Sequence, residues 1–165
     1  MDRKQIDVGQ TKTRTADPAD AEEIAHLVNS AFGPERFFID GDRTNPEKVQ
    51  ALLKKGKFLL AEDSGNLAGC VYVELQGERG YFGLLAVDPA QQRTGLGSRL
   101  VEAAEEYCRC AGCHFMDITI VNLRTPLFGY YGRLGYVENG TLPFPREQHP
   151  PKMPCHLVKM AKPLS

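Results

Sequence analysis

A chain of 165 residues has the length of one ordinary domain, and it can bury a hydrophobic core without disulfide or metal support. Its composition, 42% hydrophobic and 25% charged, is that of a globular protein. A formal net charge of -1 excludes the strong basic excess that is typical of nucleic-acid binders, so we expect no nucleic-acid partner.

The N-terminal residues 1–10 have no periodic apolar pattern and lack the apolar core of a signal peptide. No apolar run of the chain approaches the length that spans a bilayer. We therefore expect a loose arm over residues 1–10, one domain over residues 11–165, a cytoplasmic location and no membrane partner.

The five cysteines are an odd number in a chain without a secretion signal, which favours reduced thiols over a disulfide framework. Cys108, Cys110 and Cys113 lie close together but lack the paired C-x2-C spacing of a zinc site. Cys108 and Cys110 would also point to different sides of a helix. We expect no metal, and we interpret Cys70 in its apolar strand as a small core residue.

The first part of the domain predicts a strand over residues 11–15 and a helix to about Phe32, with Asp17 as N-cap and Pro18 at the first helical position. Residues 33–45 contain glycine and proline breakers around an apolar island and predict a partly structured loop. Apolar residues at helical spacing predict a second short helix over residues 46–55.

From Lys57 on, apolar runs of strand length alternate with short polar turns. The runs at 58–61, 67–75 and 81–87 predict three consecutive antiparallel strands. The last run is apolar on both of its alternating faces, which predicts a central strand that is covered on both sides.

The remaining elements complete the sheet. They are a long helix over about 94–110, a strand over 115–121, a short helix over 126–134, and strands over 136–142 and 155–161. The predicted buried stripe of the long helix consists of Leu96, Leu100, Ala103, Ala104 and Tyr107. The expected fold class is α/β, one domain with a mixed, mostly antiparallel sheet of six or seven strands and about four helices on its faces.

A buried strand, a glycine-containing loop and a helix follow one another in residues 84–100. Gly95 and Gly97 remove side chains where a backbone must approach a phosphate closely, and the N-terminus of the helix attracts negative charge. The segment lacks the third glycine of the dinucleotide fingerprint and the Gly-Lys-Ser/Thr of a Walker loop. It therefore indicates an anion site of another type.

The pattern Gln/Arg-x-x-Gly-x-Gly/Ala after a strand that ends in Val-Asp-Pro is complete at Gln92, Gly95 and Gly97, and it resembles the GNAT superfamily of acyl-CoA-dependent N-acetyltransferases. Residues 131–136, Tyr-Gly-Arg-Leu-Gly-Tyr, resemble the Tyr-x-Lys-x-Gly-Phe signature of that family, and the order of elements agrees over nearly the whole chain. The resemblance implies acetyl-CoA as cosubstrate and an amine of a small molecule or peptide as acceptor. It also allows a homodimer.

By this resemblance, acetyl-CoA lies in a V-shaped opening between the strands over 81–87 and 115–121. Its pantetheine would pair with the backbone of the first strand, and its pyrophosphate would rest on residues 93–98. Asn122 resembles the asparagine after the family's fifth strand, although it lies farther from Tyr131 than is common there. The expected cofactor-binding residues are Leu85, Ala86, Val87, Gln92, Arg93, Thr94, Gly95, Leu96, Gly97, Ser98, Asn122 and Tyr131.

Acetyl transfer needs a neutral amine, and alkyl ammonium groups have pKa values near ~10, so a base must remove a proton. Glu74 is the best carboxylate candidate because it shares its alternating strand face with Tyr72 and Cys70, with an exposed carboxylate as the alternative. Glu78 and Asp117 follow. The resemblance assigns Tyr131 as the general acid that meets the departing CoA thiolate.

Two histidines, His149 and His156, flank prolines in the connection over 143–155, which by resemblance borders the acceptor pocket. A surface-loop role is the simpler interpretation of both. This connection and residues 33–45 mix aromatic side chains with charges of both signs and indicate no acceptor class. A non-catalytic acyl-CoA-binding regulatory domain is the second hypothesis for the chain, and a protein-interaction domain without CoA affinity is the third.

Overall fold

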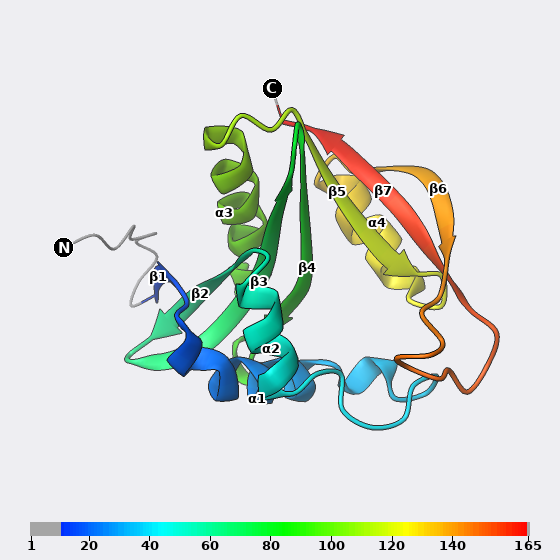
Figure 1. Ribbon diagram of the computed structural model, residues 1–165, viewed down its shortest axis with the longest axis horizontal. Coiled ribbons are helices and arrows are strands. Elements are labelled where there is room, and N and C mark those ends of the chain that lie inside the picture. Colours follow the sequence, from blue (N-terminus) through cyan, green and yellow to red (C-terminus); the bar gives the residue numbers. More distant parts are fainter. Residues whose placement is uncertain (1–10, 165) are drawn as a thin grey trace.

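The structure is a computed structural model, and it describes residues 11–164. One seven-stranded sheet has the strand order β1-β2-β3-β4-β5-β7-β6 (Figure 1). Neighbouring strands pair antiparallel, except that β4 and β5 are parallel. The strands are β1 (Thr11–Thr15), β2 (Lys57–Asp63), β3 (Asn66–Gln76), β4 (Arg79–Val87), β5 (Phe115–Val121), β6 (Val137–Pro143) and β7 (His156–Pro163).

Helices cover both faces of the sheet, and this confirms the predicted α/β class. The helices α1 (Ala21–Ala31) and α2 (Pro46–Leu53) pack on one face, whereas α3 (Leu96–Cys110) and α4 (Thr125–Arg133) pack on the other. Within residues 11–164, no helix is long and apolar enough to span a membrane. The arm predicted over residues 1–10 lies outside the described residues.

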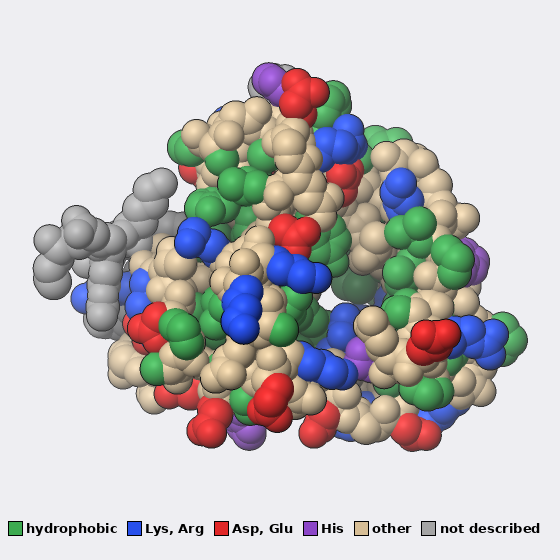
Figure 2. All heavy atoms as spheres, in the orientation of Figure 1, with side chains coloured by type: hydrophobic (Ala, Val, Ile, Leu, Met, Phe, Trp, Pro, Cys, Tyr) green, Lys and Arg blue, Asp and Glu red, His purple; other side chains and the backbone are tan. Residues whose placement is uncertain are grey.

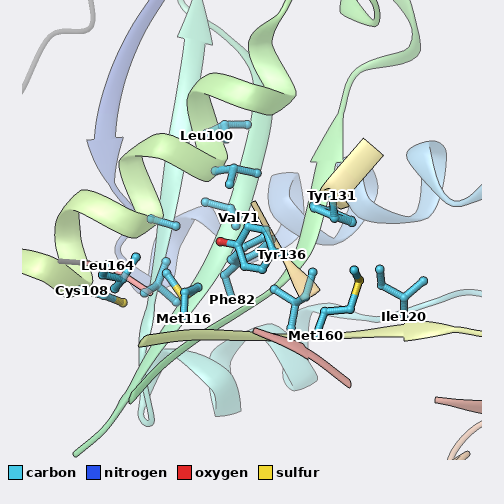
Figure 3. Packing of buried hydrophobic residues seen from close by; sticks show 14 of the residues in the cluster. Val71, Phe82, Leu100, Cys108, Met116, Ile120, Tyr131, Tyr136, Met160 and Leu164 are labelled. Atoms are coloured by element: carbon cyan, nitrogen blue, oxygen red, sulfur yellow. The ribbon is translucent and has the colours of Figure 1, made fainter. Parts of the chain in front are cut away.

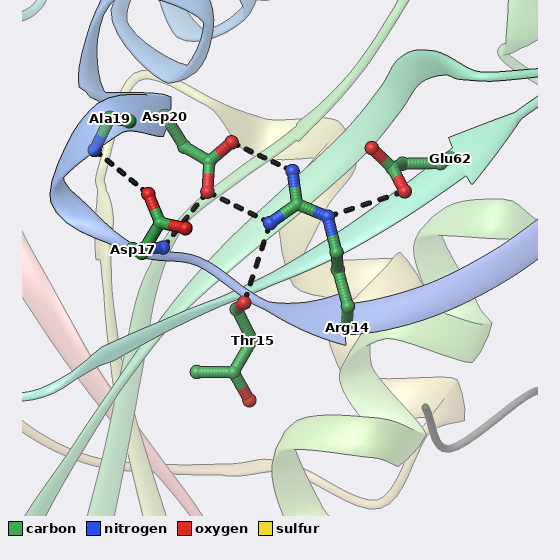
Figure 4. A network of polar contacts seen from close by, with 6 residues as sticks. All are labelled: Arg14, Thr15, Asp17, Ala19, Asp20 and Glu62. Carbon is green, nitrogen blue, oxygen red and sulfur yellow. Dashed lines mark hydrogen bonds and ion pairs between the residues drawn. The ribbon is translucent and has the colours of Figure 1, made fainter. Parts of the chain in front are cut away.

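The helix predicted from Pro18 begins as a 3-10 turn, Pro18–Asp20, which Asp17 caps as expected and which leads directly into α1. Asp17 accepts a hydrogen bond from the Ala19 N–H at 2.8 Å, and Asp20 accepts one from the Asp17 N–H at 2.8 Å. Arg14 of β1 bonds both carboxylate oxygens of Asp20, at 2.7 and 2.8 Å, and lies 3.2 Å from Glu62 of β2 (Figure 4). Because its hydrogen bonds with Arg14 favour the charged form, the pKa of Asp20 is lowered. The network joins the edge of the sheet to the first helix.

The larger core lies between α3, α4 and the sheet (Figure 3). Leu96, Leu100 and Ala104 are buried as predicted, Tyr107 is partly buried and packs against this core, and Ala103 is only partly buried. The helix instead turns Val101, Glu105 and Cys108 toward the sheet, because its buried line runs through positions 96, 100, 104 and 108.

The cysteines are distributed as their pattern suggested. Cys70 is fully buried in the core under α1, and Cys108 is buried whereas Cys110 is exposed on the same helix. Burial raises the pKa of the Cys70 thiol to about 12, so this thiol stays protonated. Among the described residues, no group of three or more His, Cys, Asp or Glu side chains is placed to hold a metal ion.

One buried carboxylate joins α3 to the far half of the sheet. Glu105 accepts a hydrogen bond from the Tyr136 hydroxyl at 2.7 Å and two from the Lys162 ammonium at 3.0 and 3.2 Å. Tyr136 immediately precedes β6, and Lys162 belongs to β7. The contacts therefore hold α3 against strands on the other side of the gap between β4 and β5.

Candidate active site

The sheet opens into a fork at the two parallel strands. The register of β4 and β5 joins only Arg79–Tyr81 with Phe115–Asp117, and beyond these residues the strands diverge (Figure 1). At the closed end, Arg79 donates two hydrogen bonds to the Asp117 carboxylate, both at 2.7 Å. The cleft between the diverging strands has a volume of about 590 Å³ and lies where the resemblance placed the V-shaped opening.

A second groove, of about 700 Å³, lies between β1 and α3. Its arginines are already paired, Arg14 with Asp20 at 2.7 Å and Arg109 with Glu106 at 2.6 Å. The fork, in contrast, is lined by a strand bulge and by Gln92, which leads into the loop before α3. We therefore place the functional site in the fork.

The bulge lies in β4 on the wall of the cleft. Cys70 pairs with Ala86 and Tyr72 pairs with Gly83, so that Leu84 and Leu85 both stand opposite one residue of β3. Leu84 has a left-handed backbone with a φ of 50°, which is costly for a branched side chain. A bulge turns backbone groups out of the regular ladder. The predicted residues Leu85, in the bulge, and Ala86 and Val87, just beyond it, line the cleft.

The loop before α3 presents a row of backbone donors. Arg93 and Gly95 have φ angles of 68° and 83°, so the helix begins at Leu96, two residues after the predicted start at about Thr94. The first backbone hydrogen bond of the helix runs from Arg99 N to Gly95 O, at 3.1 Å. Within residues 11–164, the backbone N–H groups of residues 93–98 have no acceptor. Six consecutive donors at a helix N-terminus, with glycines among them, suit a pyrophosphate.

The helices α3 and α4 contact each other next to this loop. The Ser98 hydroxyl of α3 lies 2.9 Å from the Tyr130 hydroxyl of α4. A Cβ on Gly97 would lie 3.4 Å from that same hydroxyl, whereas a Cβ on Gly95 would meet nothing within 4 Å. Glycine at position 97 therefore keeps a narrow space free between the loop and α4.

The ring of Tyr131 lies 5.0 Å from that of Tyr130, between centroids, but faces a different environment. Its ring packs against Phe82 and Tyr136, with centroid distances of 6.0 Å, and the residue is 7% exposed. It lines the cleft, and its hydroxyl has no hydrogen-bond partner in the described part of the chain. Burial raises the pKa of Tyr131, so the phenol keeps its proton at neutral pH.

Several residues singled out by the sequence do not line the cleft: the loop residues 93–98 lie beyond its lining, and so do Glu74, Glu78, Asp117, Asn122 and His156. Glu74 accepts hydrogen bonds from the Tyr72 hydroxyl and the Gln76 amide, both at 2.7 Å, and these bonds lower the pKa of its carboxyl. The Asn122 amide oxygen accepts a hydrogen bond from the His156 N–H at 2.8 Å. Asn122 therefore joins the end of β5 to the start of β7, which gives its expected cofactor role no support.

Residues 33–45 and 143–155 lie side by side (Figure 1), and both segments contribute residues to the lining of the cleft. Ile39 forms a bridge with Pro151, and the Lys152 N–H donates to the Phe38 carbonyl at 2.7 Å. Phe38, Ile39 and Phe144 are buried together beneath these connections. Residues 33–45 and 143–155, from which the sequence indicated no class of acceptor, thus form one wall of the cleft.

This wall contributes polar side chains to the lining of the cleft. Glu35 is 9% exposed and accepts a hydrogen bond from Arg124 at 2.8 Å. Burial raises the pKa of Glu35, while Arg124 and then Arg43 oppose that shift. Arg43 is one of the charged residues in the segment over 33–45 that the sequence marked as a determinant of the acceptor, whereas no sequence signal pointed to Glu35.

His149 lines the cleft and is half-buried, which does not support the surface-loop interpretation of this residue, whereas His156 is exposed. Its Nε2 lies 3.5 Å from Nη1 of Arg43. Burial, with the charges of Arg43 and Lys48, lowers the pKa of His149. The imidazole is therefore neutral at pH 7 and has a nitrogen that can accept a proton.

Comparison with known proteins gives a family and several relatives. Residues 21–136 match the model of the Acetyltransferase (GNAT) family. Blasticidin-S acetyltransferase of Streptomyces morookaense is 32% identical over 97 residues, which cover 58% of this chain and 67% of the relative.

Two solved structures share the fold at lower identity. The ribosomal-protein-S18-alanine N-acetyltransferase of Escherichia coli is 16% identical and superposes with a TM-score of 0.74 over 94% of each chain. A Salmonella typhimurium protein, solved with its cofactor acetyl-CoA, is 20% identical with a TM-score of 0.71 over 95% of each chain. At these identities the two structures support the fold alone.

Proposed function

Because the chain belongs to the Acetyltransferase (GNAT) family, we propose that its fork binds acetyl-CoA and delivers the acetyl group to an amine that enters from the wall formed by residues 33–45 and 143–155. The chain is an acyl-CoA-dependent N-acetyltransferase, as the sequence indicated. The binding mode, the catalytic residues and the acceptor are the new parts of this proposal.

The row of free backbone N–H groups over residues 93–98 carries the proposal. These donors would hold the pyrophosphate, with Gln92, Arg93 and Thr94 around it and Gly95 and Gly97 leaving room for it. The segment over residues 85–87, which begins in the bulge, would hold the pantetheine by its backbone. Acetyl-CoA supplies the activated acetyl group, and no metal is needed for this chemistry.

In the proposed reaction, the amine nitrogen attacks the thioester carbonyl carbon, and the carbon–sulfur bond then breaks. The electron pair of that bond stays on sulfur, and Tyr131 donates its proton to the resulting thiolate. A backbone N–H beside the bulge at Leu85 stabilises the negative oxygen of the tetrahedral adduct. The proton lost by the amine passes to a base.

The base is either Glu74 or His149. Glu74 is the candidate from the sequence, but its lowered pKa makes it a weak base and it lies outside the cleft lining. His149 lines the cleft and is neutral at pH 7, so it accepts a proton directly or through one water. We favour His149 for these two reasons.

The acceptor is an amine of a small molecule or peptide. The named relatives act on a small molecule, blasticidin-S, in one case and on a ribosomal protein in the other, so the fold alone does not choose between these classes. A formal net charge of -1 supports an acceptor other than nucleic acid.

Release of free thiol from acetyl-CoA, measured over a panel of amines, tests the proposal directly. A transferase releases one thiol for each acetylated amine. An acyl-CoA-binding regulatory domain would show affinity in calorimetric titration without amine-dependent thiol release, and this result would contradict the proposal.

A further inference from the structure

Three ionic side chains line the acceptor end of the cleft, and one of them is not neutralised. Glu35 and Arg124 compensate each other through a 2.8 Å ion pair. Arg43 lies over the ring of Phe32, 5.3 Å from its centroid, and 3.5 Å from the imidazole of His149. Within residues 11–164, no carboxylate lies within 4.0 Å of the Arg43 guanidinium. The ionic side chains that line this end of the cleft, Glu35, Arg43 and Arg124, therefore sum to one positive charge.

The charge of Arg43 acts inside the cleft and not on the outer surface. Burial raises the pKa values of Glu35 and Tyr81 and lowers that of His149, and in all three the charge of Arg43 adds a downward shift. All three of these groups line the cleft together with Arg43. Figure 2 shows the hollow in the middle of the molecule with Lys or Arg and His side chains at its border.

The surroundings of Arg43 keep its guanidinium available to a ligand. Phe32 supports one face of the planar group, while a neutral imidazole is a weak partner compared with a carboxylate. The positive charge of Lys48 adds to the same region, as its effect on His149 shows. The positive charge would repel a cationic group of the acceptor, whereas an anionic group could accept two parallel hydrogen bonds from the Arg43 guanidinium.

We propose that Arg43 is the receptor for an anionic group of the acceptor, so that the preferred acceptors are amines that also bear a carboxylate or a comparable oxyanion. This rests on the proposed function, because it takes the wall of the fork as the acceptor site. The guanidinium binds the carboxylate in a bidentate pair, and this directs the amine toward the bulged part of β4, where the acetyl group is expected.

Matched acceptors test this specificity. Thiol release is measured with L-methionine and L-phenylalanine and with their primary amides, which keep the amine and lose the negative charge. The amino group of an amino acid and that of its amide differ in pKa. For each acceptor, kcat/KM of the variant is therefore compared with kcat/KM of the wild type. We expect Arg43→Gln to lower kcat/KM for the acids by about tenfold or more, mainly through KM, and to leave the amides nearly unchanged.

Two further variants sharpen the result. Arg43→Lys keeps the charge but loses the bidentate geometry, so it should retain part of the preference. Arg36→Gln is the matched control, since this exposed arginine of the same segment donates to the Gly41 carbonyl at 3.4 Å and does not line the cleft. It should leave both acceptor classes unchanged.

Equal losses for acids and amides in Arg43→Gln, or an acid preference that survives this substitution, would overturn the inference while leaving acetyl transfer in place. If no amine releases thiol although acetyl-CoA binds, the proposed function fails separately. Calorimetric titration of the same carboxylates into the acetyl-CoA complex then decides the inference. Binding that disappears in Arg43→Gln supports it, and binding that does not depend on Arg43 refutes it.

Discussion

Replacing Gly97 separates cofactor binding from folding. The residue lies in the first turn of α3, and an added Cβ would lie 3.4 Å from the Tyr130 hydroxyl and 3.8 Å from Cγ2 of Val87, both ordinary contacts. Because alanine favours a helix over glycine by up to about 1 kcal/mol, Gly97→Ala should be as stable as the wild type or slightly more stable. Its melting temperature should then change by no more than about 4 °C, upward.

The effect on acetyl-CoA has the opposite sign. The new methyl group would stand among the N–H groups of residues 93–98, where the pyrophosphate is expected, and would remove at least one hydrogen bond to a charged oxygen. Such a bond is worth about 1.5–3 kcal/mol, which corresponds to a loss of affinity of about tenfold to a hundredfold. Gly97→Val should lose more, because its second methyl group approaches Tyr130.

Calorimetric titration with acetyl-CoA, together with thermal unfolding of the same samples, measures both effects. Gly132→Ala on α4 is the matched control, since a Cβ there meets nothing within 4 Å and the position does not line the cleft. Unchanged affinity in a folded Gly97→Ala protein would remove this loop from the cofactor site. If Gly97→Ala loses affinity and its melting temperature also falls, the added methyl group disturbs the packing of α3, and the expectation of unchanged stability is wrong.

Four other changes test the remaining parts of the site and the fold. Tyr131→Phe should lower kcat by roughly 10²-fold with little change in acetyl-CoA affinity, whereas Tyr130→Phe, which loses only the contact with Ser98, should be milder; the reverse order would reject Tyr131 as the acid. If His149 is the base, its lowered pKa puts the acid limb of kcat/KM below pH 6.5, because a base works only when deprotonated; His149→Gln should remove that limb, and a larger loss in Glu74→Gln would reassign the base. Glu105→Gln should cost about 1–3 kcal/mol in the free energy of unfolding by weakening the contacts to Tyr136 and Lys162, while Glu106→Gln, from an exposed pair, should cost less than about 1 kcal/mol; equal effects would argue against the buried network. Chelators should leave melting temperature and activity unchanged, and stoichiometric zinc whose removal lowers the melting temperature would contradict the metal-free interpretation.

The elements and the cofactor loop could be predicted because their signals are local. Asp17 with Pro18 indicates the start of a helical turn, and the glycines at 95 and 97 indicate the phosphate loop. Each of these signals lies within a few adjacent residues. The difference at Ala103 and Val101, between the predicted and the observed buried stripe of α3, has a physical cause as well. Ala103 and Val101 both suit an apolar helix face, and only the crossing of the helix over the sheet turns Val101 inward.

The acceptor wall could not be predicted because its parts are distant in sequence and irregular in structure. Arg43 and His149 approach only when the connection before α2 packs on the connection before β7, through Phe38, Ile39 and Phe144. Neither connection has a period or a motif that would reveal this contact. The bulge at Leu84 likewise depends on the pairing of β4 with β3, which the apolar run over residues 81–87 does not specify.

This difference between the two halves of the site has a physical basis in what each half binds. The phosphate half uses backbone N–H groups, whose placement requires glycines at fixed positions, so the sequence carries a recognisable motif. The acceptor half uses side chains such as Arg43 and Glu35, which can be presented from any backbone that reaches the cleft. A family can therefore keep one loop for a common cosubstrate and vary its acceptors through the two connections. Acceptor class must accordingly be inferred from the charges that meet in space, and in this chain the uncompensated charge is that of Arg43.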